Sequence, residues 1–281
     1  MTSQHLSSAL AGPGLVAGTA VEIAVGRLSA LRARPAGEPR GTVLLVPGFT
    51  GSREDFAPLL PLLADAGWDA WTYSQRGQAA SVAPVGVSSY SLDAFAGDLL
   101  EVAAVVGDGA PVHLLGHSFG GLVARAAVLA RPDAFVDVVL LCSGPRGWGA
   151  GKDAMLRVVD AGGSLGLWAR DHPDLVDVDP GALSDRDAFL RRRAEQTSAD
   201  NLRGIVEILW DPTDRTEELR ATGVRTLVAR GETDDAWPPE WQRQMALTLD
   251  APYEIVPEAG HCPAEENPVA TAALLDRFWR G

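Results

Sequence analysis

The chain has 281 residues, of which 46% are hydrophobic and 22% charged, a composition typical of a folded globular protein. Its formal net charge of −13 argues against nucleic acid and anionic membranes as partners, because both are polyanions. No apolar stretch reaches the roughly 18–20 residues that span a bilayer, and no Lys/Arg cluster precedes an apolar block near Met1. Two cysteines, Cys142 and Cys262, provide neither a disulfide framework nor a metal-binding set. We therefore expect a cytoplasmic protein without a signal peptide or a membrane span.

The first half of the chain alternates short apolar runs with helical patterns. After a tail that we expect to be flexible, residues 1–20, the segment Val21–Arg34 predicts a β-hairpin joined at Gly26-Arg27. The predicted buried strands are Thr42–Val46, Trp68–Tyr73, Pro111–Leu115 and Val136–Cys142. The predicted helices are Ser52–Ala66, Leu92–Val106 and Leu122–Ala130. This alternation predicts an α/β fold, a parallel sheet with helices on both faces.

The alternation stops in residues 145–223, where helical stretches such as Ala188–Thr197 and Leu202–Leu209 occur without a convincing buried strand. Because the segment is far longer than a usual crossover, it predicts a helical cap inserted into the α/β core. The alternative is a run of ordinary crossover helices. On the first interpretation the core consists of residues 21–144 and 224–281, and its later elements are strands Arg225–Ala229 and Tyr253–Val256 and a helix Val269–Trp279.

A candidate nucleophile lies between a predicted strand and a predicted helix. Residues 116–121 read Gly-His-Ser-Phe-Gly-Gly, which is the G-x-S-x-G pattern of a nucleophile elbow. Gly116 and Gly120 flank Ser118 because larger side chains there would collide with the strand and the helix. The alternative is a glycine-rich turn with an incidental serine. The strand before it and the helix after it favour Ser118 as a nucleophile.

A serine hydroxyl needs a base and a group that orients the base. His261 follows the last predicted strand, at the sheet edge where open α/β sheets bind ligands. The orienting carboxylate should follow another strand, and Asp234 is the first choice, with Asp235 as the fallback. The other histidines have weaker positions: in the tail (His5), packed in a strand (His113), pointing away from the serine (His117) and in the predicted cap (His172).

Two backbone N–H groups are candidates for an oxyanion hole. The Phe119 N–H lies at a helix start, where unpaired donors and the helix dipole favour negative charge. The Phe49 N–H follows the strand Thr42–Val46, and Gly48 allows the turn. That turn also reads as a simple strand-to-helix connection with Ser52 as N-cap, and the two interpretations are compatible.

Aromatic side chains are candidates for an apolar acyl pocket, although they are also common core material. The candidates are Phe49, Trp148, Trp168, Trp210 and Trp237. Of these, Phe49 and Trp237 flank the proposed site, so we expect them to contact substrate. We expect Cys262, beside the candidate base, to be a small packed residue.

The order of these motifs from about Val21 onward resembles the α/β-hydrolase superfamily. The elbow and the Gly260-His261 loop, followed by Glu266-Asn267-Pro268, are the most specific parts, and Gly48–Ser52 looks like bacterial carboxylesterases and monoacylglycerol-lipase-like members. The resemblance implies a mostly parallel eight-stranded sheet, a Ser118–His261–Asp234 triad, and Phe49 and Phe119 as oxyanion donors. Two departures weaken assignment to a subfamily: Pro47 replaces a common histidine, and Ser74–Ser81 lacks the usual acid and second glycine.

The function implied is hydrolysis of a carboxylic ester, or of a thioester or lactone, through an acyl-enzyme. Such a reaction requires no metal or cofactor, and the expected partner is a small-molecule substrate with an apolar acyl group. The alternatives are a cofactor-free haloperoxidase, a C–C bond hydrolase, a proline iminopeptidase or an acyltransferase on the same fold. A binding protein with an idle triad is a third hypothesis, and the presence of all three residue types argues against it.

Overall fold

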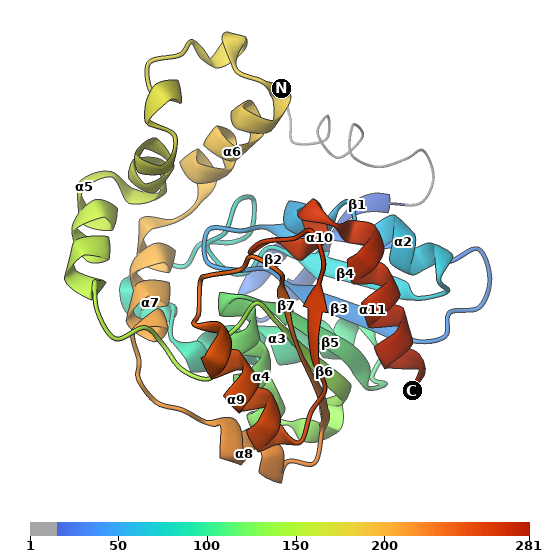
Figure 1. Ribbon diagram of the computed structural model, residues 1–281. Coiled ribbons are helices and arrows are strands. Elements are labelled where there is room, and N and C mark those ends of the chain that lie inside the picture. Colours follow the sequence, from blue (N-terminus) through green and yellow to red (C-terminus); the bar gives the residue numbers. More distant parts are fainter. Residues whose placement is uncertain (1–15) are drawn as a thin grey trace.

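The computed structural model describes residues 16–281, which form one eight-stranded sheet and the helices around it (Figure 1). The strand order is β1-β2-β4-β3-β5-β6-β7-β8. The strands are β1 (Val16–Ile23), β2 (Gly26–Ala33), β3 (Thr42–Val46), β4 (Asp69–Tyr73), β5 (Val112–His117), β6 (Phe135–Leu141), β7 (Arg225–Gly231) and β8 (Tyr253–Val256). The β1–β2 and β2–β4 pairs are antiparallel, and the other neighbouring pairs are parallel. The predicted α/β fold with a mostly parallel eight-stranded sheet is confirmed.

Two helical layers cover the sheet. The helices are α2 (Leu60–Asp65), α3 (Leu92–Val106), α4 (Phe119–Ala130), α5 (Lys152–Asp171), α6 (Asp185–Gln196), α7 (Ala199–Leu209), α8 (Thr216–Ala221), α9 (Pro239–Leu249), α10 (Pro263–Glu266) and α11 (Pro268–Arg280). Short 3₁₀ turns are η1 (Arg53–Phe56), η2 (Val87–Ser89), η3 (Pro132–Ala134), η4 (Pro173–Leu175) and η5 (Pro180–Ala182). Residues of α3, α4, α8 and α9 pack in one core cluster, and residues of α2, α10 and α11 pack in the other.

The strand β3 shows why the central strands read as continuous apolar runs. Val43 and Leu45 pack in the cluster beneath α2 and α11, whereas Leu44 and Val46 pack in the cluster beneath α3 and α4. Successive side chains of a strand point to opposite faces, so a strand covered on both faces needs apolar residues at every position. The strands β3 to β8 are parallel, so their carboxyl ends, and the loops that follow, lie at one edge of the sheet.

The N-terminal hairpin differs from its prediction. Strand β1 begins at Val16, so residues 16–20, predicted as part of a flexible tail, pair with β2; residues 1–15 of that tail lie outside the described range. Ile23 pairs with Gly26, so the hairpin turns at Ala24-Val25 rather than at Gly26-Arg27. The alternating pattern of the two strands hid this offset, because a shift of two residues keeps each side chain on the same face.

The predicted helix Ser52–Ala66 is two elements, η1 and α2. Pro58 lies between them, and its missing N–H interrupts a continuous helical ladder. Helix α9 was not predicted, since Pro238-Pro239 and a mixed polar pattern obscure its periodicity. The helix Leu92–Val106 has the predicted bounds.

Between β6 and β7 the described chain contains four helices, α5 to α8, and no strand. Figure 1 shows α5 and α6 standing beyond the edge of the sheet, while α8 lies beside α9. Leu219 of α8 is buried in the core cluster with α4 and α9. This last helix of the insertion therefore resembles an ordinary crossover helix, and the cap bounds 145–223 stay a prediction. No helix within residues 16–281 combines the length and apolar character of a bilayer crossing.

Candidate active site

The backbone at Ser118 makes a sharp turn between β5 and α4. Its φ of 55° and ψ of −121° are unusual for a residue with a side chain, and backbone strain of this kind occurs mainly at functional sites. Two hydrogen bonds hold the turn: the Ser118 N–H donates to the Leu141 carbonyl at 2.9 Å, and the Gly121 N–H donates to the Ser118 carbonyl at 2.9 Å. The strained conformation is thus fixed by β6 on one side and by α4 on the other.

The two glycines that flank the serine are required by close backbone contacts. A Cβ on Gly116 would lie 2.3 Å from the Gly120 carbonyl oxygen, and a Cβ on Gly120 would lie 2.4 Å from the Val46 carbonyl oxygen. Both distances are far below a van der Waals contact. The predicted collision with the strand and the helix is therefore what the structure shows, and it explains the glycine spacing of the motif.

The structure brings Ser118, His261 and Asp234 together although they lie far apart in the chain. The Ser118 Oγ–His261 Nε2 distance is 3.0 Å, and the His261 Nδ1–Asp234 Oδ1 distance is 2.7 Å. An imidazole that donates through Nδ1 to a carboxylate keeps Nε2 free to accept the hydroxyl proton. The three side chains form one chain of hydrogen bonds from the carboxylate to the serine.

Asp234 differs from its neighbour Asp235 in burial and contacts. Asp234 is 1% exposed, whereas Asp235 lies on the surface. Burial alone raises the pKa of the Asp234 carboxyl, but hydrogen bonds and the charge of His261 outweigh it, so the net pKa is lowered. Asp234 Oδ1 also accepts from the Ala236 N–H at 3.2 Å, and Oδ2 accepts from Gln242 Nε2 at 3.3 Å.

His117 packs against His261, the candidate base. Its Nε2 donates to the His261 carbonyl oxygen at 2.6 Å, and the two ring centroids are 5.0 Å apart. Burial, followed by the nearby His261, lowers the His117 pKa to about 3. A neutral ring at this place supports the backbone of His261 without adding a positive charge beside it.

The oxyanion candidates belong to two segments that lie next to Ser118. Phe119 is the first residue of α4, whose N–H has no acceptor within the helix. Phe49 belongs to the loop after β3, and a Cβ on Gly48 would lie 3.1 Å from Ser118 Cβ and 3.5 Å from its Oγ. The loop after β3 therefore approaches the serine closely. Ser52, the alternative interpretation of this segment, is the N-cap of η1.

A cavity of 520 Å³ opens over Ser118 and His261. Phe49 and His117 line it from the core, and helices α5 and α6 supply the opposite wall through Ser164, Leu167, Trp168, Asp171, Arg186, Leu190, Arg193 and Ala194. Trp148 also lines it, as does His172, whose Nδ1 donates to the Trp168 carbonyl at 3.0 Å. Phe49, Trp148 and Trp168 thus lie in the lining, as expected for pocket residues.

Trp237 does not lie in this cavity, which corrects the expectation that it contacts substrate. Its side chain is fully buried in the core, and Nε1 donates to the Arg146 carbonyl at 2.9 Å. A Cβ on Gly144 would lie 2.1 Å from the indole, so the tryptophan fills a space that this glycine leaves. Proximity to Asp234 in the sequence does not place Trp237 at the cavity, because its indole packs on Gly144 in the core instead. Trp210 packs against Trp148 at the edge of the core, also outside the cavity lining.

Two ion pairs tie α6 to the core at the cavity wall. Arg193 pairs with Asp55 of η1 at 2.5 Å, and Arg186 pairs with Glu265 of α10 at 2.9 Å. Burial raises the pKa of both carboxyls, against the opposing effect of the arginines. The charged groups of this wall are therefore largely neutralised by one another, and Phe49, Trp148 and Trp168 add apolar surface to the lining.

The cysteines and the remaining histidine play packing roles. Burial raises the pKa of the Cys262 thiol to about 12 and raises that of the Cys142 thiol well above its ordinary value, so neither is a thiolate. His113 donates to Asp137 within the sheet, as a packed histidine would. Within residues 16–281, one group could hold a metal ion: His117, Cys142 and His261, with ligand atoms within 4.8 Å. Both ring nitrogens of His261 already have hydrogen-bond partners outside this group, Asp234 and Ser118.

Three residues that support the site were not predicted from the sequence. Gln242 of α9 bonds the Asp234 carboxylate, and Arg230 donates to the Asp234 carbonyl. Gln78 bonds the loop that carries Phe49. Their polar side chains are buried, and the residue type alone does not predict that a glutamine or an arginine will be buried.

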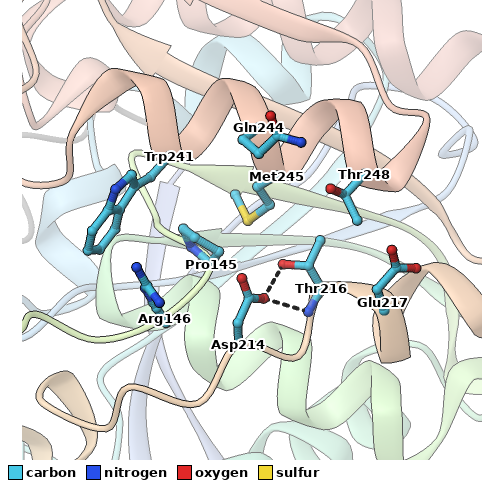
Figure 2. A pocket seen from close by; sticks show the side chains of 9 residues that line it. All are labelled: Pro145, Arg146, Asp214, Thr216, Glu217, Trp241, Gln244, Met245 and Thr248. Carbon is cyan, nitrogen blue, oxygen red and sulfur yellow. Dashed lines mark hydrogen bonds between the residues drawn. The ribbon is translucent and has the colours of Figure 1, made fainter.

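A second cavity of 440 Å³, between α8, α9 and Pro145-Arg146, contains none of the predicted site residues (Figure 2).

Comparisons with known proteins agree with this fold. A model of the alpha/beta hydrolase family matches residues 43–274. A Caulobacter segnis protein named "Putative carbamate hydrolase RutD" is 31% identical over 255 residues, which cover 86% of this chain and 92% of that protein.

Solved structures share the architecture at low identity. A thermophilic esterase from Thermogutta terrifontis has a TM-score of 0.74 at 22% identity, covering 94% of this chain and 98% of the esterase. An enol-lactonase from Burkholderia xenovorans LB400 has a TM-score of 0.77 at 20% identity, covering 94% of this chain and all of the lactonase, 100%. With the family model matching most of its length, this chain belongs to the alpha/beta hydrolase family.

Proposed function

We propose that this hydrolase cleaves a carboxylic ester through an acyl-enzyme on Ser118, with His261 as base and Asp234 as the orienting carboxylate. The observation that carries the proposal is the unbroken chain of hydrogen bonds from Asp234 through His261 to Ser118, at 2.7 and 3.0 Å. Ser118 and His261 face a cavity whose lining includes Phe49, Trp148 and Trp168, and these aromatic side chains suit an apolar acyl group.

The mechanism has two acyl-transfer steps. His261 Nε2 takes the hydroxyl proton as Ser118 Oγ bonds to the substrate carbonyl carbon, and Asp234 stabilises the resulting imidazolium. The Phe49 and Phe119 N–H groups donate to the developing oxyanion. Collapse of the tetrahedral intermediate breaks the bond to the leaving alcohol, which departs with the proton from His261. Water, deprotonated by His261, then attacks the acyl-serine and releases the acid.

Carbamate hydrolysis is the second candidate. It is favoured by one observation, the 31% identity to the Caulobacter segnis protein named for that activity. The same three side chains can attack a carbamate carbonyl, because the chemistry at Ser118 is again acyl transfer. The two candidates differ in the class of substrate whose carbonyl bond is broken. The charges of the cavity wall neutralise one another, so they do not favour a charged substrate in either case.

The free cysteines support a cytoplasmic setting for this activity. Cys142 is buried and Cys262 is partly buried, and neither forms a disulfide. The cavity volume of 520 Å³ is that of a small-molecule site.

The test is turnover on a panel: p-nitrophenyl butyrate, a butyryl thioester, a butyrolactone, p-nitrophenyl carbamate, a prolyl peptide and a peroxide-dependent halogenation substrate. We expect the ester to be turned over fastest, and Ser118→Ala to lose at least about 10³-fold in kcat. Faster turnover of the carbamate would select the second candidate. Ester turnover that survives in Ser118→Ala would refute the proposal.

A further inference from the structure

The segment Ser74–Ser81, which departs from the usual pattern of the superfamily, contains two buried glutamines that face the loop after β3. Gln75 and Gln78 are 1% and 0% exposed. Gln75 Nε2 donates to the Pro47 carbonyl at 3.0 Å, and Gln78 Nε2 donates to the Gly48 carbonyl at 2.7 Å. Two buried amides thus bond consecutive carbonyls of the loop that carries Phe49.

The orientation of the Gln78 amide is determined by its other bond. The Gln75 backbone N–H donates to Gln78 Oε1 at 2.9 Å, so the oxygen end of this amide is already engaged by a donor. Its nitrogen end therefore faces the loop, where the Phe49 carbonyl accepts a second, longer bond at 3.3 Å. Reversing the amide would place two oxygens together at Gly48 and two donors together at Gln75.

The bond to Gly48 also fixes the direction of the next N–H. The Gly48 carbonyl and the Phe49 N–H belong to one planar peptide unit, and in a trans unit they point in opposite directions. Gln78 holds the carbonyl on one side of the loop, so the Phe49 N–H points to the other side. Gly48 approaches Ser118 so closely that a Cβ added to it would lie only 3.5 Å from Oγ, which places Ser118 near this peptide unit.

The insertion between β6 and β7 holds the turn that carries Gln78. The Ser198 N–H donates to the Gly77 carbonyl at 2.9 Å, and Asn201 Nδ2 donates to the Arg76 carbonyl at 2.7 Å. Both donors lie at the start of α7. The turn that carries Gln78 is therefore held by α7 on one side, while Gln78 itself bonds the loop after β3 on the other.

We propose that Gln78 is a positioning residue that fixes the Gly48–Phe49 peptide with its N–H directed at the oxyanion. The inference rests on the proposed hydrolase function, because a fixed donor matters only where an oxyanion forms at Ser118. Gln75 bonds the preceding peptide unit, which contributes no oxyanion donor. The two glutamines thus differ in role although they share residue type, burial and loop.

The test compares three variants on p-nitrophenyl butyrate. Gln78→Met removes the donor at similar volume, and Gln78→Glu replaces the donor with an oxygen that repels the Gly48 carbonyl. Since loss of one oxyanion donor costs about 10²–10³-fold, we expect kcat to fall about tenfold or more in Gln78→Met and further in Gln78→Glu, with KM within about twofold. Gln75→Met is the matched control, and its kcat should fall less than about threefold.

Inhibition by butylboronic acid provides a readout that a merely structural role would not move. Its tetrahedral adduct with Ser118 places a boronate oxygen in the oxyanion site, so its affinity should weaken in the Gln78 variants by about the same factor as kcat/KM. The inference is overturned if folded Gln78 variants keep kcat and boronate affinity within about threefold, or if Gln75→Met loses as much as Gln78→Met. Boronate inhibition absent from the wild type, or turnover unaffected by Ser118→Ala, would refute the proposed function instead.

Discussion

At the scale of single residues, burial separates side chains that the sequence presents as equivalent. Asp234 and Asp235 are adjacent acids on one loop, yet only Asp234 is buried and bonded to His261. Asp234 was the first choice from the sequence, with Asp235 as the fallback, and the contacts agree with the first choice. Ser118 and His261 were identifiable because local motifs surround them, whereas Gln78 and Gln242 were not, because their contacts come from distant segments.

Asp234→Asn should reduce kcat/KM by about 10⁴-fold, the loss that the corresponding substitution causes in serine proteases. The amide would donate to His261 Nδ1, which favours the tautomer that cannot accept the serine proton. Asp235→Asn is the matched control, and its kcat/KM should stay within about twofold, since its side chain is exposed. Steady-state kinetics on p-nitrophenyl butyrate makes the comparison, and a larger loss in Asp235→Asn would move the assignment to that residue.

His117 should make folding stability depend on pH. Its pKa is about 3 in the folded protein and near 6.5 when unfolded, so between these values the unfolded state binds a proton that the native state does not. The contribution to stability is full above pH 6.5 and is lost as the pH falls toward 3. By pH 4.5 the loss amounts to about 2–3 kcal/mol, because each pKa unit is worth about 1.4 kcal/mol.

His117→Gln removes this titration and keeps an N–H near the His261 carbonyl. We therefore expect the free energy of unfolding of the variant to decline less than that of the wild type between pH 7 and pH 4.5, measured by urea denaturation. Equal declines in the two proteins would show that the ring does not titrate as its burial indicates.

At the scale of elements, the strands and the helical character of the insertion were predictable, whereas the path of its first helix was not. β3, β8 and α3 have the predicted bounds, and β4, β5, β6 and β7 differ from theirs by one or two residues at an end, because continuous apolar runs between turn residues are local signals. Helix α5 carries the Ala161–Ser164 stretch, where two glycines interrupt the helical pattern. The structure contains a kink there: Gly163 has φ of 57° and ψ of −147°.

Gly163→Ala should destabilise the protein by about 1–3 kcal/mol, because that backbone conformation is strained for any residue with a Cβ. Gly162→Ala is the matched control, since a Cβ there has open space within 4 Å and alanine favours a helix. It should be neutral or stabilising by up to about 1 kcal/mol. Denaturation followed by circular dichroism and tryptophan fluorescence makes the comparison, and similar free energies for the two variants would contradict the kink.

At the scale of the whole molecule, the sheet brings loops from distant parts of the chain to one edge. The loops after β3, β5, β7 and β8 carry Phe49, Ser118, Asp234 and His261, so the parallel topology assembles the site. Chain order and strand–helix alternation sufficed to predict this arrangement. The cavity wall from α5 and α6 could not be predicted, because its side chains are placed by long-range contacts such as Arg193–Asp55.

The similarity of the whole chain to known proteins indicates a hydrolase, but it does not identify the bond that is hydrolysed. The relative with 31% identity is named as a carbamate hydrolase, while solved structures of the same fold include an esterase and an enol-lactonase. Because one fold serves several reactions, the substrate has to be identified from the cavity and by experiment, whereas the nucleophile is proposed from the geometry at Ser118.

Labelling with a fluorophosphonate probe, followed by peptide mapping, tests whether Ser118 is that nucleophile. The probe requires a serine activated by a base and an oxyanion site, and it needs no knowledge of the natural substrate. We expect stoichiometric labelling of the wild type on the peptide that contains Ser118, and no labelling of Ser118→Ala. Labelling at another residue, or labelling that persists in Ser118→Ala, would contradict the assignment.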